Sequence, residues 1–146
     1  MSDAQTYPPI TPYLLYEDVG AALEWLSAAF GFQERLRFAD DEGTISHAEM
    51  TVGPAGLIML GYPGGDYRNP KRSGAATVLI HVIVEDVDAH YARALQAGAE
   101  ILREPADEEY GDRRYDAQDP EGHQWSFAQR VRDVSPSEWG ASTSDC

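Results

Sequence analysis

The feature that most constrains this chain is a unit that occurs twice. Val78–Ile101 (VLIHVIVEDVDAHYARALQAGAEI) opens with an apolar, β-branched run and continues with apolar residues at helical spacing that stop at a glycine. Tyr13–Phe32 (YLLYEDVGAALEWLSAAFGF) has the same order. In each copy an aspartate stands where a helix N-cap is expected. Since Glu17-Asp18-Val19 precedes Glu85-Asp86-Val87 by 68 residues, we interpret the chain as a tandem repeat.

Hydrophobic periodicity extends each copy to the order β-α-β-β-β. In the first copy we expect the strands Ile10–Glu17, Phe32–Ala39, Thr44–Val52 and Leu57–Leu60, and the helix Val19–Phe30. In the second copy we expect the strands Thr77–Val84, Glu100–Glu104, Arg113–Gln118 and His123–Gln129, and the helix Val87–Ala97. The predicted fold class is therefore α+β, with two tandem βαβββ modules that share one core.

Three segments lie outside the two modules. The first is a polar N-terminal arm that ends in two prolines, the second is a connector rich in Gly and Pro, and the third is an acidic, Ser-rich tail that we expect to be flexible. The expected boundaries are 1–9 for the arm, 10–60 for module one, 61–74 for the connector, 75–129 for module two and 130–146 for the tail. Residues 10–129 would form a single domain.

The charge balance restricts the partners. Asp and Glu number 25 against 11 Lys and Arg, so the net charge is −14 and the surface repels phosphate backbones and anionic membranes. We therefore expect no nucleic-acid and no membrane partner. The N-terminus lacks the features of a signal peptide, and no segment reaches the ~20 apolar residues of a membrane span. Because Cys146 is the only cysteine, no disulfide forms within the chain, and we expect a cytoplasmic protein.

The order of several short motifs resembles the glyoxalase/bleomycin-resistance/extradiol-dioxygenase superfamily, also called vicinal oxygen chelate. These motifs are Tyr16-Glu-Asp-Val19, Phe30-Gly-Phe32, Glu85-Asp-Val-Asp88, Ala97-Gly-Ala99, Asp119-Pro-Glu-Gly-His123 and Trp125-Ser-Phe127. Tyr110-Gly-Asp-Arg113 and His47-Ala-Glu-Met50 resemble a bacterial subgroup of small members. The resemblance implies two mixed sheets curled around a cleft, with helices outside, and a homodimer.

The resemblance also implies where a metal would bind. Relatives with metal chemistry hold one divalent ion with four side chains from the first and fourth strands of each half. These positions correspond to Thr11, Met59, Leu79 and Ser126 in this sequence. Divalent ions prefer carboxylate oxygen or imidazole nitrogen, which Met and Leu do not supply. We therefore expect no metal at these positions and no other cofactor.

Strand alternation places further side chains on the same inward faces. His47 and Glu49 lie two residues apart on one strand, and His81 shares a face with Leu79. A mostly apolar wall with a few hydrogen-bonding groups is typical of a small-molecule pocket. The predicted lining residues are Thr11, Tyr13, His47, Glu49, Met59, Leu79, His81 and Ser126. Tyr62 and Tyr67, on the connector, are expected to close over it.

Three classes of function remain open. The favoured class is a metal-independent binding protein of the sequestration or resistance type, because the family's metal ligands are missing. The alternative is a lyase, isomerase or dioxygenase with a non-standard metal or acid–base site around His47, Glu49 and His81, in which His47 and Glu49 transfer protons. The third class is an interaction module whose cleft is only a dimer interface. The charge of Glu49 favours a cationic or neutral ligand.

Other side chains receive structural interpretations. We expect Trp125 and Phe127 in the core between helix and sheet, and Trp139 docked on the body of the protein. His90 is expected on a solvated helix face, and His123 is expected to face outward or to cap its turn.

Overall fold

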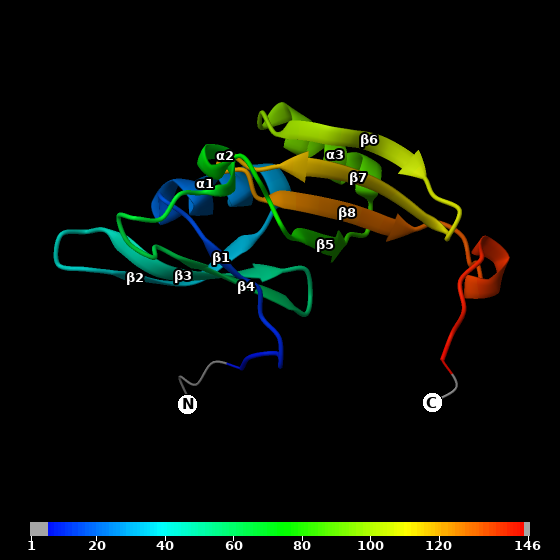
Figure 1. Cartoon of the computed structure of the whole chain (residues 1–146), viewed down its shortest axis with the longest axis horizontal. Coiled ribbons are helices and arrows are strands. Elements are labelled where there is room, and N and C mark those ends of the chain that lie inside the picture. The colour runs from blue at the N-terminus through cyan, green and yellow to red at the C-terminus, as the bar shows by residue number, and fades with distance from the viewer. Residues whose placement is uncertain (1–5, 145–146) are drawn as a thin grey trace.

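Each repeat forms its own four-stranded sheet (Figure 1). The structure is a computed structural model that describes residues 6–144. Residues 1–5, Asp145 and Cys146 lie outside the described part. The first sheet has the strand order β1-β4-β3-β2 and the second sheet the order β5-β8-β7-β6. In each sheet the first pair is parallel and the others are antiparallel. The α+β class and the two tandem modules are confirmed.

The elements follow the expected order with a few changes in length. Module one contains β1 (Tyr13–Leu15), α1 (Val19–Phe30), β2 (Gln33–Ala39), β3 (Ile45–Val52) and β4 (Gly56–Gly61). The connector contains a short helix, α2 (Pro70–Ser73). Module two contains β5 (Leu79–Ile83), α3 (Val87–Gln96), β6 (Glu100–Asp107), β7 (Asp112–Gln118) and β8 (Gln124–Arg130). A 3₁₀ helix, η1 (Pro136–Trp139), follows β8.

The largest changes in length occur beside prolines. The strand β1 begins only after Pro12, whose carbonyl accepts a hydrogen bond from the Met59 N–H although its own nitrogen has no hydrogen to donate. The strand β6 runs to Asp107, beyond the expected end at Glu104. Its pairing with β7 is irregular between Arg103 and Ala106, around Pro105. Because β6 is an edge strand, a proline is tolerated there.

The two long helices begin at the predicted caps. The Asp18 carboxylate accepts a hydrogen bond from the Ala21 N–H, and the Asp86 carboxylate accepts one from the Ala89 N–H. At its other end α1 stops at Gly31, whose φ of 75° suits glycine.

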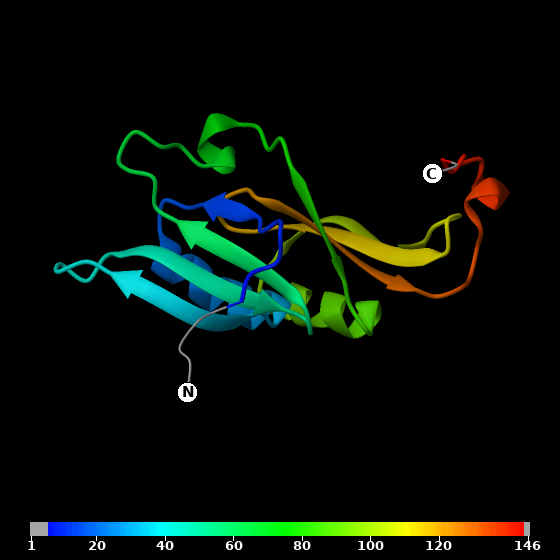
Figure 2. The ribbon, with the colours of Figure 1, turned by 90° about the horizontal axis from the view of Figure 1, so that it is seen from below.

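The two modules share one core. The helices α1 and α3 contact one another, and each also packs on its own sheet; in Figure 2, α1 lies behind the strands of the first sheet. Phe30, at the end of α1, packs its ring 5.6 Å from Trp125 and 4.6 Å from Phe127, both on β8. Trp125 and Phe127 are fully buried, as predicted. Each sheet therefore turns one face to the shared core, and we call the other its open face.

Asp119, in the turn before β8, joins the modules through a buried carboxylate that is 3 % exposed. It accepts hydrogen bonds from the Tyr16 hydroxyl at 2.7 Å and the Trp125 indole N–H at 3.2 Å. The backbone N–H groups of Glu121 and His123 add two more at 3.0 Å. Burial, and then the charge of Asp119, hold the pKa of Tyr16 well above its usual value.

Glu121, in the same turn, holds the N-terminus of α1. Its carboxylate accepts hydrogen bonds from the N–H groups of Glu17 at 2.6 Å and Asp18 at 2.9 Å, which lie just before the helix. The Asn69 side chain, from the connector, donates to the same carboxylate at 3.0 Å. A carboxylate is well placed here, because a helix N-terminus favours negative charge.

The C-terminus of α1 is held by Arg93 and His90 of α3. The Arg93 guanidinium donates to the carbonyls of Ala28 at 3.0 Å and Ser27 at 2.9 Å. His90 Nε2 lies 3.0 Å from the Phe30 carbonyl, to which it donates. These carbonyls belong to the last turn, where a helix leaves C=O groups without backbone partners, although Ser27 also accepts from the Gly31 N–H.

His90 does not lie on a solvated face, so this expectation was wrong. Its Nδ1 lies 2.5 Å from the Tyr115 hydroxyl, and its ring packs 4.1 Å from that of Phe127. The packing of α3 against α1 buries this side of the helix, which the sequence of α3 alone does not reveal. Burial lowers the pKa of His90.

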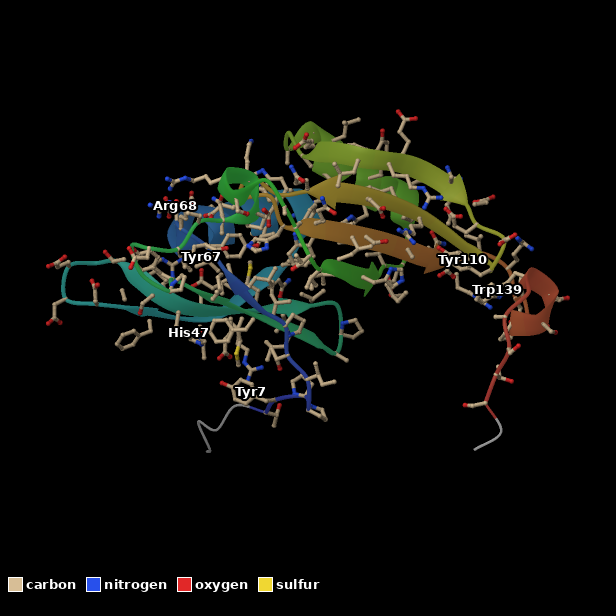
Figure 3. The ribbon with its side chains drawn as sticks, in the orientation of Figure 1. Tyr7, His47, Tyr67, Arg68, Tyr110 and Trp139 are labelled. Carbon is tan, nitrogen blue, oxygen red and sulfur yellow. The ribbon has the colours of Figure 1, made fainter. Side chains whose placement is uncertain are left out.

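The segment after β8 returns to the second sheet. The rings of Trp139 and Tyr110 lie 5.8 Å apart, beside each other in Figure 3. The docking of Trp139 is thus observed. Among residues 6–144, no helix has the length and apolar character needed to cross a membrane.

We predict that Asp119→Asn destabilises the whole fold. The amide has one acceptor oxygen and no charge, so it cannot accept four hydrogen bonds as the carboxylate does, and the loss should be at least about 2 kcal/mol in the free energy of unfolding. Urea denaturation measures it. Asp41→Asn, on the exposed turn before β3, is the matched control and should change little; equal stability of the two variants would contradict the role of Asp119.

We also predict that His90 makes stability depend on pH. Because its folded-state pKa lies below the ordinary 6.5, the unfolded chain binds the proton more readily. This stabilisation is complete above pH 6.5 and is lost as the pH falls through the lower, folded-state pKa. The pH dependence of unfolding should therefore be weaker for His90→Gln than for the parent chain. His81→Gln, at an exposed histidine, should retain the dependence of the parent chain.

Candidate functional site

Seven of the eight predicted lining residues lie on the open faces of the two sheets. On β3, Ala48 and Met50 are buried in the core, so His47 and Glu49 point to the opposite face. The residues on the open face of the first sheet are Tyr13, His47, Glu49 and Met59, and those on the second sheet are Leu79, His81 and Ser126. Thr11 precedes β1. The structure thus brings these residues into two groups, one on each sheet.

A hydrogen-bonded chain links three residues of the first group. The Tyr13 hydroxyl lies 2.7 Å from His47 Nδ1, and His47 Nε2 lies 3.1 Å from Glu49 Oε2. An ionised carboxylate can only accept, so Nε2 carries a hydrogen, and in the neutral imidazole Nδ1 then accepts the Tyr13 proton. We call Tyr13, His47 and Glu49 the relay. The sequence predicted the His47–Glu49 pair but not the link to Tyr13.

The N-terminal arm covers the buried end of the relay. The Tyr7 hydroxyl donates to Glu49 Oε2 at 3.1 Å, and the Arg35 guanidinium lies 4.9 Å from the centre of the Tyr7 ring. Arg35 also donates to the Thr6 carbonyl. Figure 3 places Tyr7 beneath His47, on the open side of the first sheet. As a result Glu49 is only 2 % exposed. Sequence reasoning missed this role of Tyr7, because an arm without periodicity gives no sign of where it lies.

The Glu49 carboxylate has unequal oxygens. Oε2 accepts from both Tyr7 and His47, whereas Oε1 is buried without a hydrogen-bond partner among the described atoms. Arg35 Nε approaches Oε1 to 3.7 Å, which is an ion-pair distance but too long for a hydrogen bond. Oε2 is thus compensated by two hydrogen bonds, and Oε1 by the charge of Arg35 alone.

Gly61, on β4, makes room for the Tyr13 ring. It pairs with His47 in the sheet, and a Cβ atom built on Gly61 would lie 2.5 Å from Tyr13 Cε1. The ring therefore lies across the glycine backbone, which brings its hydroxyl to His47. This requirement for glycine was also missed, since Gly61 looked like the start of the connector.

The second group makes a simpler contact. His81 Nδ1 lies 3.2 Å from the Ser126 hydroxyl, and Leu79 is 44 % exposed beside them. On the adjacent strand, Arg114 donates to both oxygens of Asp116 at 3.1 Å. Such a bidentate pair fixes both side chains.

A hollow of about 460 Å³ lies between β1, the connector and the start of β5. Its wall includes Leu15, Tyr67, Arg68 and Val78, and of the eight predicted residues only Tyr13. Tyr67 donates its hydroxyl to the Leu15 carbonyl at 2.8 Å, and burial raises its pKa. It therefore forms part of the wall of this hollow.

His123 was expected at the start of the last strand, facing outward or capping its turn, and Tyr62 on the connector; they lie in different places. His123 Nε2 lies 2.7 Å from the Leu15 carbonyl, and its ring packs 4.7 Å from that of Tyr16. It thus contributes to the joint between the modules. Tyr62 lines a separate hollow beside Glu17 and Ile45.

Residues 10–127 match the sequence model of the Glyoxalase/Bleomycin resistance protein/Dioxygenase superfamily. The chain belongs to this superfamily. The match covers both modules, including the relay and the turn that contains Asp119, and the resemblance seen in the sequence motifs is confirmed.

Relatives and solved structures agree with this assignment. An uncharacterized protein of Mycobacterium bovis, Mb0911c, is 35 % identical over 141 residues, which is 94 % of this chain and 93 % of that protein. The crystal structure of TioX from Micromonospora sp. ML1 is 35 % identical and has a TM-score of 0.70, covering 84 % of this chain and 98 % of TioX. The crystal structure of a superfamily member from Sphaerobacter thermophilus is 21 % identical and has a TM-score of 0.64, covering 82 % of this chain and 94 % of that chain. This similarity supports the fold alone.

The metal position implied by the superfamily does not fit this chain. Met59 and Leu79 offer no oxygen or nitrogen donor, and Thr11 and Ser126 offer only hydroxyls. Within residues 6–144 no group of three or more His, Cys, Asp or Glu side chains is arranged to hold a metal ion. The alternative donors are divided, because His81 lies on the second sheet while His47 and Glu49 lie on the first.

Proposed function

We propose that this chain is a small-molecule binding protein of the sequestration or resistance type, which needs no metal. One observation supports this most directly: each sheet buries one face in the shared core and leaves the other with large apolar and hydrogen-bonding side chains. This combination is typical of surfaces that receive a small molecule. The proposed contacts are the two groups around the relay and around His81.

We propose that a second copy of the chain completes the site. Tyr13 and Phe38 of the first sheet are 51 % and 62 % exposed, and Leu79 and Ile83 of the second are 44 % and 65 % exposed. Moreover β1 and β5 are edge strands. Exposed apolar faces and unpaired edges are usually covered by a partner. A homodimer in which the second sheet of one copy covers the first sheet of the other would unite the two groups in one cleft.

The chemistry of the first sheet favours a cationic or neutral ligand. Glu49 places a buried negative charge beneath the open face, in a chain of net charge −14. An anion would be repelled by both. The cytoplasm, which the sequence predicts as the compartment, remains a prediction.

The proposed dimer predicts that Ile83→Glu dissociates the chain. A charge at the centre of an apolar contact loses its hydration, so the dimer should become unstable. Light scattering at micromolar concentration should give twice the chain mass for the parent protein and the mass of one chain for the variant. Leu95→Glu, at an exposed leucine on α3, is the control and should leave the dimer intact. A parent chain that is monomeric at this concentration would refute the proposal.

The proposed ligand chemistry predicts that Glu49→Gln weakens the binding of a cation. The loss should be about 1–3 kcal/mol, the range for hydrogen bonds to a charged group. A thermal-shift screen of cationic antibiotics and small metabolites identifies compounds, and calorimetry measures their affinity for each variant. Glu42→Gln, on the exposed β2–β3 turn, removes the same charge elsewhere and should have no effect. Hits that are mainly anionic would contradict this prediction.

Met59→Trp tests the same face by volume. Met59 pairs with Tyr13 and Glu49 in the sheet, so a larger side chain at this position should fill the space above the relay. Binding of the compounds found in the screen should be lost while the fold is kept, as judged by circular dichroism. Unchanged affinity would place the ligand elsewhere.

A further inference from the structure

We propose that Tyr13 is a reactive tyrosine, whose phenolic oxygen attacks an electrophilic acyl, sulfonyl or phosphoryl centre while His47 takes its proton. The inference rests on the proposed function only in that a small molecule must reach the open face of the first sheet. It adds covalent chemistry to a site so far described by binding alone.

The relay runs from a buried carboxylate to an exposed tyrosine side chain. Glu49 is 2 % exposed and Tyr13 is 51 % exposed, with His47 between them. The order of acceptors leaves Nδ1 of the neutral imidazole free of hydrogen and 2.7 Å from the phenol. A hydroxyl is activated as a nucleophile when a base is in hydrogen-bond contact with it and a third group, such as a carboxylate, orients that base.

Glu49 is a positioning residue in this arrangement. It does not contact Tyr13, but it holds the imidazole through Nε2 and places a negative charge where the imidazolium forms. Its Oε1 is buried without a hydrogen-bond donor and has only the Arg35 guanidinium at 3.7 Å beside it, so an imidazolium adds to the compensation of the carboxylate.

The position of Tyr13 is fixed by the backbone beneath it. Without a side chain at Gly61 the ring lies against the strand, and a Cβ there would be 2.5 Å from Cε1 and 2.9 Å from the hydroxyl oxygen. The glycine thus sets the approach of the phenol to His47, independently of the hydrogen bond itself.

The second sheet provides an internal comparison. The two sheets have equivalent pairings. Met59 pairs with Tyr13 on one side and Glu49 on the other, and Ser126 pairs in the same way with His81 and Asp116. Asp116 is therefore the equivalent of Glu49. At this equivalent position the carboxylate of Asp116 is neutralised by a guanidinium.

That guanidinium belongs to Arg114, which stands where His47 stands in the first sheet, and Ala128 stands where Gly61 stands. An arginine remains protonated, so it cannot take a proton from a neighbour. The fold therefore accepts a simple ion pair at these positions, and a titratable base with an exposed phenol is a property of the first sheet.

The chemical step is balanced with a sulfonyl fluoride as the electrophile. The Tyr13 oxygen forms a bond to sulfur, the sulfur–fluorine bond breaks, and fluoride leaves. The phenolic proton moves to His47 Nδ1, and the resulting imidazolium lies beside Glu49. The product is an aryl sulfonate ester of Tyr13. A neutral electrophile suits the acidic surroundings of the site.

The experiment uses benzenesulfonyl fluoride and the full chain, with intact mass and peptide mapping over time. Tyr13 should be the tyrosine labelled most rapidly. Tyr62, 39 % exposed on the loop after β4, serves as the reference within the same protein. His47→Gln should slow the labelling of Tyr13 by roughly 10–100-fold, as expected for loss of a general base, and leave Tyr62 unchanged. Tyr13→Phe should remove the rapid labelling and leave that of Tyr62 in place.

Two further variants separate chemistry from structure. Glu49→Gln keeps an acceptor for His47 Nε2, so nitrogen NMR should still find Nδ1 without hydrogen while the labelling of Tyr13 slows. Gly61→Ala should displace the Tyr13 ring, keep the His47–Glu49 pair and slow the labelling as well. Glu42→Gln is again the control for charge.

Every measurement is repeated in Ile83→Glu, so that a partner covering Tyr13 does not conceal the result. Labelling only in this variant would mean that the dimer restricts access to a reactive Tyr13. Labelling of Tyr13 no faster than that of Tyr62 in both proteins, or a rate unchanged by His47→Gln, would overturn the inference. A monomeric parent chain with a reactive Tyr13 would refute the proposed dimer and leave the relay in place.

Discussion

The arrangement of the whole molecule depends on how module two holds both ends of α1. A helix leaves N–H groups unsatisfied at its start and carbonyls at its end. Glu121 satisfies groups at the start, while Arg93 and His90 satisfy carbonyls at the end. Asp119 ties the same turn to Tyr16. Because module two fixes both termini of this helix, the two modules have one relative orientation, with α1 and α3 in contact and the open faces directed away from the shared core.

This orientation separates the parts of the sequence that stabilise the fold from those available for function. On β3 the alternation is complete: Ala48 and Met50 lie in the core, and His47 and Glu49 lie on the open face. A polar residue on that face does not disturb the core packing. Glu49 differs from its neighbours on this face because it is not exposed: the N-terminal arm buries it through Tyr7. The carboxylate must therefore be compensated within its own network, and this need orders the relay.

Features set by local pattern could be predicted from the sequence, and those set by contacts between distant segments could not. The bounds of α1, its Asp18 cap and the inward phase of β3 follow from periodicity and capping, which involve neighbouring residues only. Alternation also gave the phase of β5 correctly, but it does not say where one sheet lies relative to the other, so the expected single group of lining residues is two groups. His90 was misplaced for the same reason, because its burial depends on α1. The Gly61–Tyr13 contact depends on pairing across strands.

The two sheets carry different side chains at the positions of the relay, and this difference bears on what the relay does. Equivalent positions in a repeat experience the same backbone geometry, so a difference between them reflects what each side chain does rather than what the fold requires. Asp116 has a permanently charged partner that fixes it as a stable ion pair. Glu49 has an imidazole, which lies between it and the Tyr13 hydroxyl and can take a proton from that hydroxyl. The Arg35 guanidinium, 3.7 Å from Oε1, already gives this carboxylate a permanently charged neighbour. The choice of histidine at this position, with glycine beneath the phenol, is therefore what the proposed proton transfer from Tyr13 requires.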